Sequence, residues 1–126
     1  MPATRALNLP FSDAVRVGEL LFLSGQLGNL PGEPRLAPGG VTAETRQAME
    51  NIRAVLAQYD LGMDSLVKCT VFLADMADWS DFNAVYVEYF TGPLPARSAL
   101  GVNGLALGAR VELECVAYAG RVKESS

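Results

Sequence analysis

Apolar residues recur along this chain with two different periods, and the period separates the predicted strands from the predicted helices. Short runs of apolar residues, many alternating with polar ones, are typical of strands, because successive side chains point to opposite faces of a sheet. Gly18-Glu19 separates the first two of these runs and is typical of a tight hairpin turn. The runs predict strands at residues 14–17, 20–24, 66–73, 97–102 and 110–118.

Apolar residues spaced three or four positions apart predict a first helix between residues 42 and 62. We expect Thr42 to be its N-cap, Glu44 to place a favourable charge in its first turn, and Gly62 to stop it. The apolar stripe of this helix comprises Ala48, Met49, Ile52, Val55, Leu56 and Tyr59.

A second helix is expected after Asp78, which is a suitable cap, and it ends before Gly92-Pro93 because proline stops a helix. Trp79 is expected in its first turn, as a core residue or a hydrophobic staple. The apolar positions of this helix are Trp79, Phe82, Val85, Tyr86, Tyr89 and Phe90.

The resulting order, β-β-α-β-α-β-β, predicts an α+β fold in which one mixed sheet carries both helices on one face. Residues 28–40 hold three prolines and four glycines and are expected to form a loop. Since no linker or repeat interrupts the chain, we expect residues 1–126 to form a single domain. Val71 and Leu73 alternate with Phe72, so the strands are apolar on both sides and the second face needs cover. The sequence therefore predicts an oligomer.

Composition narrows the classes of function. The 126 residues carry a net charge of −4, and the ten basic residues are scattered, which disfavours a nucleic-acid surface. There is no histidine, and Cys69 and Cys115 have no metal-ligand spacing, so we expect no metal site and two buried thiols. No apolar run is long enough to span a membrane and no secretion signal is evident, so a cytoplasmic location without membrane contact is expected.

Candidate chemistry lies near the end of the chain, in Pro95-Ala96-Arg97-Ser98 and in Glu112-Leu113-Glu114. Arg97 follows a stiff proline and offers a planar fork that matches a carboxylate. Alternation places Glu112 and Glu114 on one face, and a glutamate on a strand neighbouring Arg97 could handle a proton or a water molecule. The alternative is a surface ion pair.

Six segments in register extend this picture over nearly the whole chain. Through them the chain resembles the RidA/YjgF family of reactive-intermediate deaminases, which also carries the older label L-PSP endoribonuclease. The segments are Phe22-Leu23-Ser24-Gly25-Gln26, Thr45-Arg46-Gln47-Ala48-Met49-Glu50-Asn51-Ile52, Val67-Lys68-Cys69-Thr70-Val71-Phe72-Leu73, Asn83-Ala84-Val85-Tyr86, Pro95-Ala96-Arg97-Ser98 and Val111-Glu112-Leu113-Glu114.

The resemblance implies a chorismate-mutase-like fold and a homotrimer with ligand clefts between adjacent subunits. It implies that Arg97 binds the carboxylate of a small 2-imino or 2-keto acid and that Glu112 holds or activates the attacking water. Glu114 is expected to pair with another charge.

Five further residues match positions that line the cleft in this family: Phe11, Ser24, Gly25, Asn83 and Ala99. Two of them depart from the family pattern. Phe11 stands where many relatives have tyrosine, which keeps the aromatic wall and removes its hydroxyl. Ala99 stands where some relatives have cysteine, which leaves its backbone carbonyl to contact a substrate nitrogen or water.

The resemblance therefore implies an enamine/imine deaminase that hydrolyses reactive 2-imino acids to 2-keto acids and ammonia without a cofactor. Three alternatives remain open. The first is a non-catalytic module that binds 2-keto acids. The second is a deaminase of one pathway with a substrate such as an aminomuconate-like intermediate, and the third is a ribonuclease or translation inhibitor. The acidic charge and the absence of histidine count against the last of these.

Overall fold

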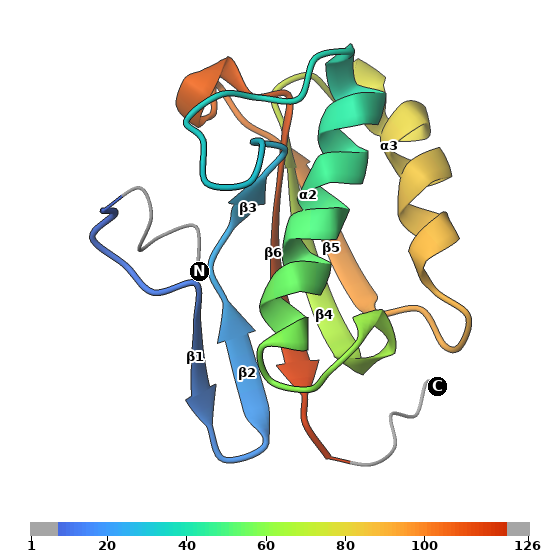
Figure 1. Ribbon diagram of the computed structural model, residues 1–126. Coiled ribbons are helices and arrows are strands. Elements are labelled where there is room, and N and C mark those ends of the chain that lie inside the picture. Colours follow the sequence, from blue (N-terminus) through green and yellow to red (C-terminus); the bar gives the residue numbers. More distant parts are fainter. Residues whose placement is uncertain (1–7, 121–126) are drawn as a thin grey trace.

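The computed structural model describes residues 8–120, which form one mixed sheet with two helices packed on one of its faces (Figure 1). The predicted fold class is confirmed, and so is the predicted element order except for one additional strand of two residues, β3, before the first helix. The helices are α2 (Gly40–Ala57) and α3 (Trp79–Tyr86). The strands are β1 (Ala14–Val17), β2 (Leu20–Leu23), β3 (Gln26–Leu27), β4 (Leu66–Leu73), β5 (Ala96–Gly101) and β6 (Val111–Tyr118).

The strands lie in the order β1-β2-β6-β4-β5. β2 and β3 pair with the same edge of β6: β2 at residues 116–118 and β3 at Glu112 and Leu113. β4 and β5 run parallel, joined by a connection through α3, and all other neighbours are antiparallel. A parallel pair needs such a crossover, because a tight hairpin can join only antiparallel strands. One consequence matters for function: β4 lies between β5 and β6.

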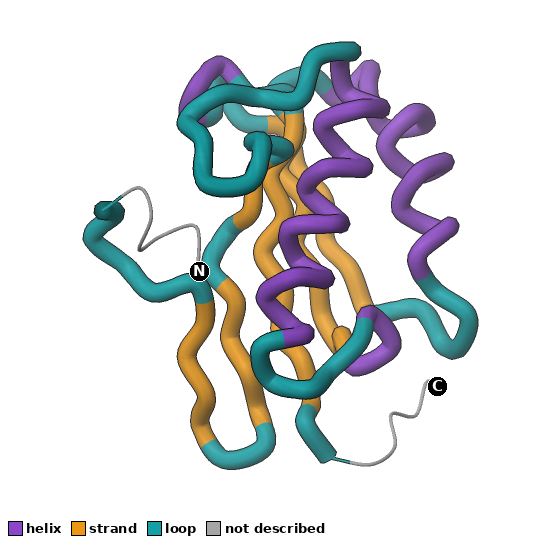
Figure 2. The backbone as a smooth tube through the Cα atoms, in the orientation of Figure 1, coloured by secondary structure: helices purple, strands orange, loops and turns teal. Residues whose placement is uncertain are grey.

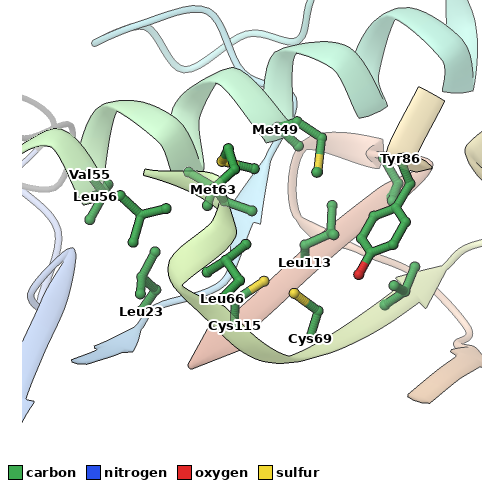
Figure 3. Packing of buried hydrophobic residues seen from close by; sticks show 14 of the residues in the cluster. Leu23, Met49, Val55, Leu56, Met63, Leu66, Cys69, Tyr86, Leu113 and Cys115 are labelled. Carbon is green, nitrogen blue, oxygen red and sulfur yellow. The ribbon is translucent and has the colours of Figure 1, made fainter. Parts of the chain in front are cut away.

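Both helices lie over the same side of the sheet (Figure 2), and the buried apolar residues of the core come from the sheet and from both helices. Leu113 and Cys115 of β6 point into this core beside Cys69 of β4, beneath Met49 of α2 (Figure 3). Cys69 and Cys115 are opposite each other in the strand register; neither forms a disulfide, and both are almost completely buried. The prediction of two buried thiols is confirmed.

The start of α2 differs from the prediction. The helix begins at Gly40, after an N-cap at Gly39, so Thr42 lies inside the helix and caps nothing. Gly39 and Gly40 both have positive φ, a conformation that favours glycine and that makes the sharp entry possible. Glu44 is not a first-turn surface charge, because its side chain is buried and accepts a hydrogen bond from the Arg110 backbone N–H at 2.8 Å.

The end of α2 also comes earlier than predicted, at Ala57 rather than at Gly62. The Leu61 N–H donates to the Leu56 carbonyl at 3.0 Å, and Asp60 takes the positive φ of 58° that such a helix end requires. Aspartate tolerates this left-handed conformation better than most residues, which is why the helix stops without a glycine.

Asp78 directly precedes α3, as predicted, but its side chain makes no capping hydrogen bond. Its carboxylate pairs instead with Arg110, with 3.3 Å between Oδ2 and Nε. The loop over residues 28–40 is present and contains one isolated bridge between Asn29 and Leu36, near the short extended piece expected there.

The sheet face opposite the helices exposes apolar side chains. Leu20 and Phe22 alternate with the buried Leu21 and Leu23, so they point away from the core. Strand pairing continues this surface onto β1 and β5, and we call it the open face. Its exposed large apolar residues are Val15, Val17, Leu20, Phe22 and Leu100.

Candidate active site

Arg97 lies near the start of β5, and its half-buried side chain meets the aromatic rings of α3. Its guanidinium carbon is 5.0 Å from the centre of the Trp79 ring, 5.5 Å from that of Phe82 and 4.9 Å from that of Tyr86. Among the described residues, no carboxylate forms an ion pair with Arg97. The ring faces therefore hold the cation in place, while its N–H donors stay available to a ligand.

Two other predicted residues belong to the region where α3 covers β5. Ala99 follows Arg97 by two positions, so both lie on the same face of the sheet, and Ala99 packs against the core. Asn83 is half-buried on α3, one turn after Trp79. Its Oδ1 is buried and accepts no hydrogen bond within residues 8–120. A buried amide oxygen without a partner is unusual and is suited to a ligand's N–H.

Glu112 points to the other side of the sheet. It lies between Val111 and Leu113, both fully buried on the helix side, so its carboxylate is on the open face. The prediction that Glu112 and Glu114 share a face is confirmed. Burial, followed by the charge of Glu114, raises the pKa of the Glu112 carboxyl. A carboxyl with a raised pKa exchanges a proton more readily near neutral pH than an ordinary one.

Gly25 lies directly against this carboxylate. A Cβ added at Gly25 would overlap the Oε2 atom of Glu112 and come within 2.9 Å of its Cδ atom. A side chain at position 25 would therefore displace the Glu112 carboxylate from where it now lies. The structure brings these two predicted residues together, although 87 positions separate them in the sequence (112 minus 25).

Ser24 fixes the segment that carries Phe11. Its hydroxyl donates to the Ser12 carbonyl at 2.6 Å, and its backbone N–H donates to the Asp13 carbonyl at 2.9 Å. Phe11, one residue before this anchor, has half of its surface exposed (50%). Phe11 is therefore exposed next to the segment that Ser24 fixes.

The predicted site residues fall into two groups that one copy of the chain keeps apart. Arg97 and Ala99 are on the helix side of the sheet, whereas Glu112 is on the open face with Gly25 beside it. The expectation that Glu112 lies on a strand neighbouring Arg97 is wrong, because β4 separates β5 from β6. We call these groups the arginine half-site and the glutamate half-site.

The aromatic group around Arg97 was missed at the sequence level. Trp79 was expected in the core or as a staple, but it is 39% exposed and its ring covers Arg97. The available signal was the spacing of Trp79, Phe82 and Tyr86, which puts three rings on one face of a helix. That spacing alone could not say that a cation lies beneath them.

A groove of about 240 Å³ on the outer side of the helices lies apart from both half-sites. Arg46 pairs with Glu88 at 3.1 Å and Arg53 pairs with Glu50 at 3.0 Å, and the Tyr89 hydroxyl donates to Glu50 at 2.7 Å. Because its charges are paired with one another, this groove lacks a free cation comparable to Arg97.

Within residues 8–120, no three His, Cys, Asp or Glu side chains gather in a way that could hold a metal ion. Neither helix of this part of the chain has the length and apolar character needed to cross a bilayer.

Comparison with known proteins agrees with the fold. The family model described as endoribonuclease L-PSP matches residues 3–119. A mouse protein named 2-iminobutanoate/2-iminopropanoate deaminase is 43% identical over 111 residues, covering 88% of this chain and 82% of that protein.

Two solved structures are similar over most of the chain. RidA from the Antarctic bacterium Psychrobacter sp. superposes with a TM-score of 0.82 at 37% identity, covering 86% of this chain and 88% of that one. Escherichia coli TdcF with bound serine superposes with a TM-score of 0.81 at 29% identity, covering 86% of this chain and 87% of that one.

The fold and the two half-sites thus define a small α+β protein with a half-buried glutamate and with an arginine that has no ion-pair partner among residues 8–120. More particularly, the chain belongs to the endoribonuclease L-PSP family, which is the RidA/YjgF family that its sequence motifs indicated.

Proposed function

We propose that this protein is an imine deaminase that hydrolyses small 2-imino acids to 2-keto acids and ammonia without a cofactor. The observation that carries the proposal is Arg97, a guanidinium surrounded by three aromatic rings with no ion-pair partner among residues 8–120. The names of the mouse and bovine relatives, both 2-iminobutanoate/2-iminopropanoate deaminase, support it.

Arg97 anchors the substrate carboxylate in this mechanism. Two parallel N–H···O hydrogen bonds fix both the position and the plane of a carboxylate, which lysine, as a point charge, cannot do. Orientation contributes much of the rate here, because an imine carbon is already electrophilic and needs mainly a well-placed water. The bound serine in TdcF is a carboxylate with a nitrogen on the adjacent carbon, the same pattern as a 2-imino acid.

Glu112 handles the proton. As the water oxygen bonds to the imine carbon, the carboxylate accepts a proton from that water and then returns it to the nitrogen. The hydroxyl of the resulting carbinolamine then gives up its proton to the same carboxylate, which passes it to the nitrogen as the C–N bond breaks. Ammonia leaves and the 2-keto acid remains. The raised pKa of Glu112 suits this role, because a base works best when its pKa is close to the working pH.

The complete site requires two copies of the chain. Arg97 and Glu112 are on opposite faces of one sheet, so one carboxylate ligand reaches both only if a second copy presents its half-site. We propose a homotrimer in which the open faces pack together and each cleft joins one arginine half-site to a neighbour's glutamate half-site. The exposed apolar side chains of the open face support this assembly, since burying them is favourable.

The remaining predicted residues would complete the cleft. Gly25 and Phe11 form the wall beside Glu112, with Ser24 holding that wall in place. On the arginine side, the Ala99 carbonyl and the Asn83 Oδ1 would steady the imine nitrogen. We propose that the protein acts in the cytoplasm, where two free thiols are the usual state of cysteine, and that it binds no nucleic acid.

A second candidate is a binding module without turnover. Phe11 favours it, because the ring provides a wall but has no hydroxyl with which to orient water or substrate. A deaminase restricted to one pathway uses the same residues as the leading proposal and differs from it only in the substrate.

A coupled assay tests the proposal. An amino-acid oxidase generates 2-imino acids from several amino acids, and semicarbazide traps the imine that survives. The wild type should reduce the trapped imine, whereas Arg97→Ala and Glu112→Gln should not. If the wild type matches buffer with every amino acid yet binds 2-ketobutyrate, the binding module is the better account. RNA binding that weakens with salt would favour the ribonuclease reading instead.

Mixing the two inactive variants tests the shared site. After co-refolding Arg97→Ala with Glu112→Gln, each mixed trimer contains one cleft with both residues intact, so about a quarter of wild-type activity should return from an equimolar mixture. No recovery, with mixed trimers verified by mass spectrometry, would mean that each chain builds its site alone.

A further inference from the structure

The side chain of Asn51, in the middle of α2, ties this helix to the strand beside Glu112. Its Nδ2 donates to the Leu27 carbonyl at 3.1 Å and to the Asn29 carbonyl at 2.9 Å. Its Oδ1 accepts from the Nε2 of Gln47 at 2.9 Å, one helical turn earlier. With both donors and the acceptor in use, the amide has one orientation. We call this arrangement of Gln47, Asn51 and the two carbonyls the α2 clasp.

The α2 clasp holds β3, a strand too short to be kept in place by its own pairing with β6. β3 contains two residues, and it pairs with β6 only at Leu113 and Glu112. Strands in proteins usually have five or six residues, and a two-residue ladder contributes little. The bonds from Asn51 therefore supply much of what keeps β3 against β6.

Helix α2 also fixes the surroundings of β3 at two other points. Gly28 passes so close to the Glu44 backbone that an added Cβ would lie within 2.6 Å of the Glu44 Cα. The Glu44 carboxylate accepts the N–H of Arg110, the residue before β6. One helix thus positions both chain segments that flank Glu112.

These contacts lead to the carboxylate through Gly25, which directly precedes β3 and lies against Glu112. We propose that Asn51, oriented by Gln47, is a positioning residue for Glu112: by holding β3 against β6, it keeps the Gly25 wall over the carboxylate and thereby fixes where the attacking water is held. This inference rests on the proposed function.

The groups around Glu112 determine how loss of the α2 clasp would change the pKa of its carboxyl. Glu114 is the charged neighbour on β6, and Lys68, whose Nζ donates to the Ser98 hydroxyl at 2.9 Å, is the only charged residue of β4. β3 contributes Gln26 and Leu27, neither of which is charged. Since burial is the main cause of the raised pKa of Glu112, lifting β3 would expose the carboxylate and lower that pKa.

The test compares Asn51→Ala with Asn29→Ala in the full-length protein. Within residues 8–120 the Asn29 side chain bonds only to the carbonyls of Leu30 and Glu33, so Asn29→Ala makes the same chemical change in the loop after β3 without releasing β3. Gln47→Met, which keeps both Asn51 donors and removes only the bond that orients them, is a milder second variant. All variants are assayed well below their unfolding temperatures.

Asn51→Ala should lower kcat by about 10- to 100-fold, because a displacement of about 1 Å in a catalytic group costs that much, and KM should stay within about twofold because Arg97 is untouched. The acid limb of the pH–rate profile should move to lower pH, and ¹³C NMR titration should report the same shift for the Glu112 carboxyl. Gln47→Met should give smaller changes in the same direction, and Asn29→Ala should give none.

Two results would overturn the inference: an Asn51→Ala enzyme with unchanged kcat and pH profile, or equal changes in Asn29→Ala. Gln47→Met is the milder change. If Asn51→Ala does not fold, the shift of the acid limb in the pH–rate profile of Gln47→Met decides the question. Failure of the proposed function looks different, since the wild type itself would then be inactive. In that case the NMR shift of Glu112 in Asn51→Ala would still support the clasp, and its absence would refute it.

Discussion

Arg97 and Glu112 have contrasting surroundings, and these set what each residue can do. The Arg97 guanidinium lies against the faces of three rings, which stabilise a cation without occupying its donors. Glu112 is half-buried beside a second carboxylate, which disfavours its charged form. The first environment favours a permanent charge that binds, and the second favours a group that exchanges a proton.

Trp79 should therefore contribute to substrate affinity through Arg97. Removing one cation–π contact of about 0.5–1 kcal/mol in Trp79→Leu should raise KM about two- to fivefold, with kcat nearly unchanged. Trp79→Phe, which keeps a ring over the guanidinium, should be close to the wild type. Steady-state kinetics on one imino acid measures both. An unchanged KM in Trp79→Leu would mean that Phe82 and Tyr86 suffice.

Glu114 should influence the pH dependence of the reaction. Its negative charge raises the pKa of Glu112, so Glu114→Gln should lower that pKa, and the acid limb of the kcat profile should move to lower pH. Glu88→Gln makes the same chemical change on the outer helical surface and should leave the limb in place. A limb that moves equally in both variants would contradict the role of Glu114.

At this scale the sequence pointed to two candidate residues but not to their neighbours. The motifs around Arg97 and Glu112 pointed to both side chains, and alternation correctly placed Glu112 with Glu114. The expectation of a core position for Trp79 was wrong, because helical spacing says which residues share a face and does not say what that face covers.

Among the elements, the ends of α2 depend on unusual backbone conformations. Asp60 adopts a positive φ of 58° just after the helix, and it is exposed. Asp60→Gly should stabilise the protein by about 1 kcal/mol, because a left-handed conformation costs a residue with a Cβ about that much. Asp60→Ala should destabilise it, since alanine also lacks the polar group that makes this conformation tolerable. Urea denaturation measures both, and equal effects would show that φ is not the cause.

The long elements were predictable and the short ones were not. β4 and β6 were found to within one residue, because eight residues show a clear alternation. β3 has two residues, too few for any period, and it exists because β6 and the α2 clasp hold it. Likewise, the start of α2 follows from the backbone conformation of Gly39 and Gly40. The composition of this segment indicates only that it belongs to a loop.

On the scale of the whole molecule, the proposed trimer requires that the open faces pack together before a complete site can form. Phe22 is 44% exposed there, so Phe22→Glu should place a charge in the packed interface and yield a monomer without activity. Val87→Glu changes an exposed residue on the helical side and should keep the oligomer. Sedimentation equilibrium gives the masses. A wild-type mass of one chain, or an active monomeric Phe22→Glu, would refute assembly as a condition for catalysis.

The prediction of an oligomer rested on apolar residues at both faces of the strands. The structure has such residues on the open face, for example the exposed Phe22 and Leu100. The relation between Arg97 and Glu112 could not be obtained in the same way. Strands that follow each other in sequence are often neighbours, but here β4 is inserted between β5 and β6 by the crossover through α3. Strand order is a property of the whole sheet, and no local pattern encodes it.

The opposed cysteines in the middle of the sheet have a practical consequence. Cys69 and Cys115 are 0% and 1% exposed, so an alkylating reagent can reach them only in molecules whose helices have left the sheet. Fast alkylation of the native protein should then proceed at the rate of global unfolding, and mass spectra should show chains with no label or two labels. A persistent population with one label would reveal that β4 or β6 opens by itself.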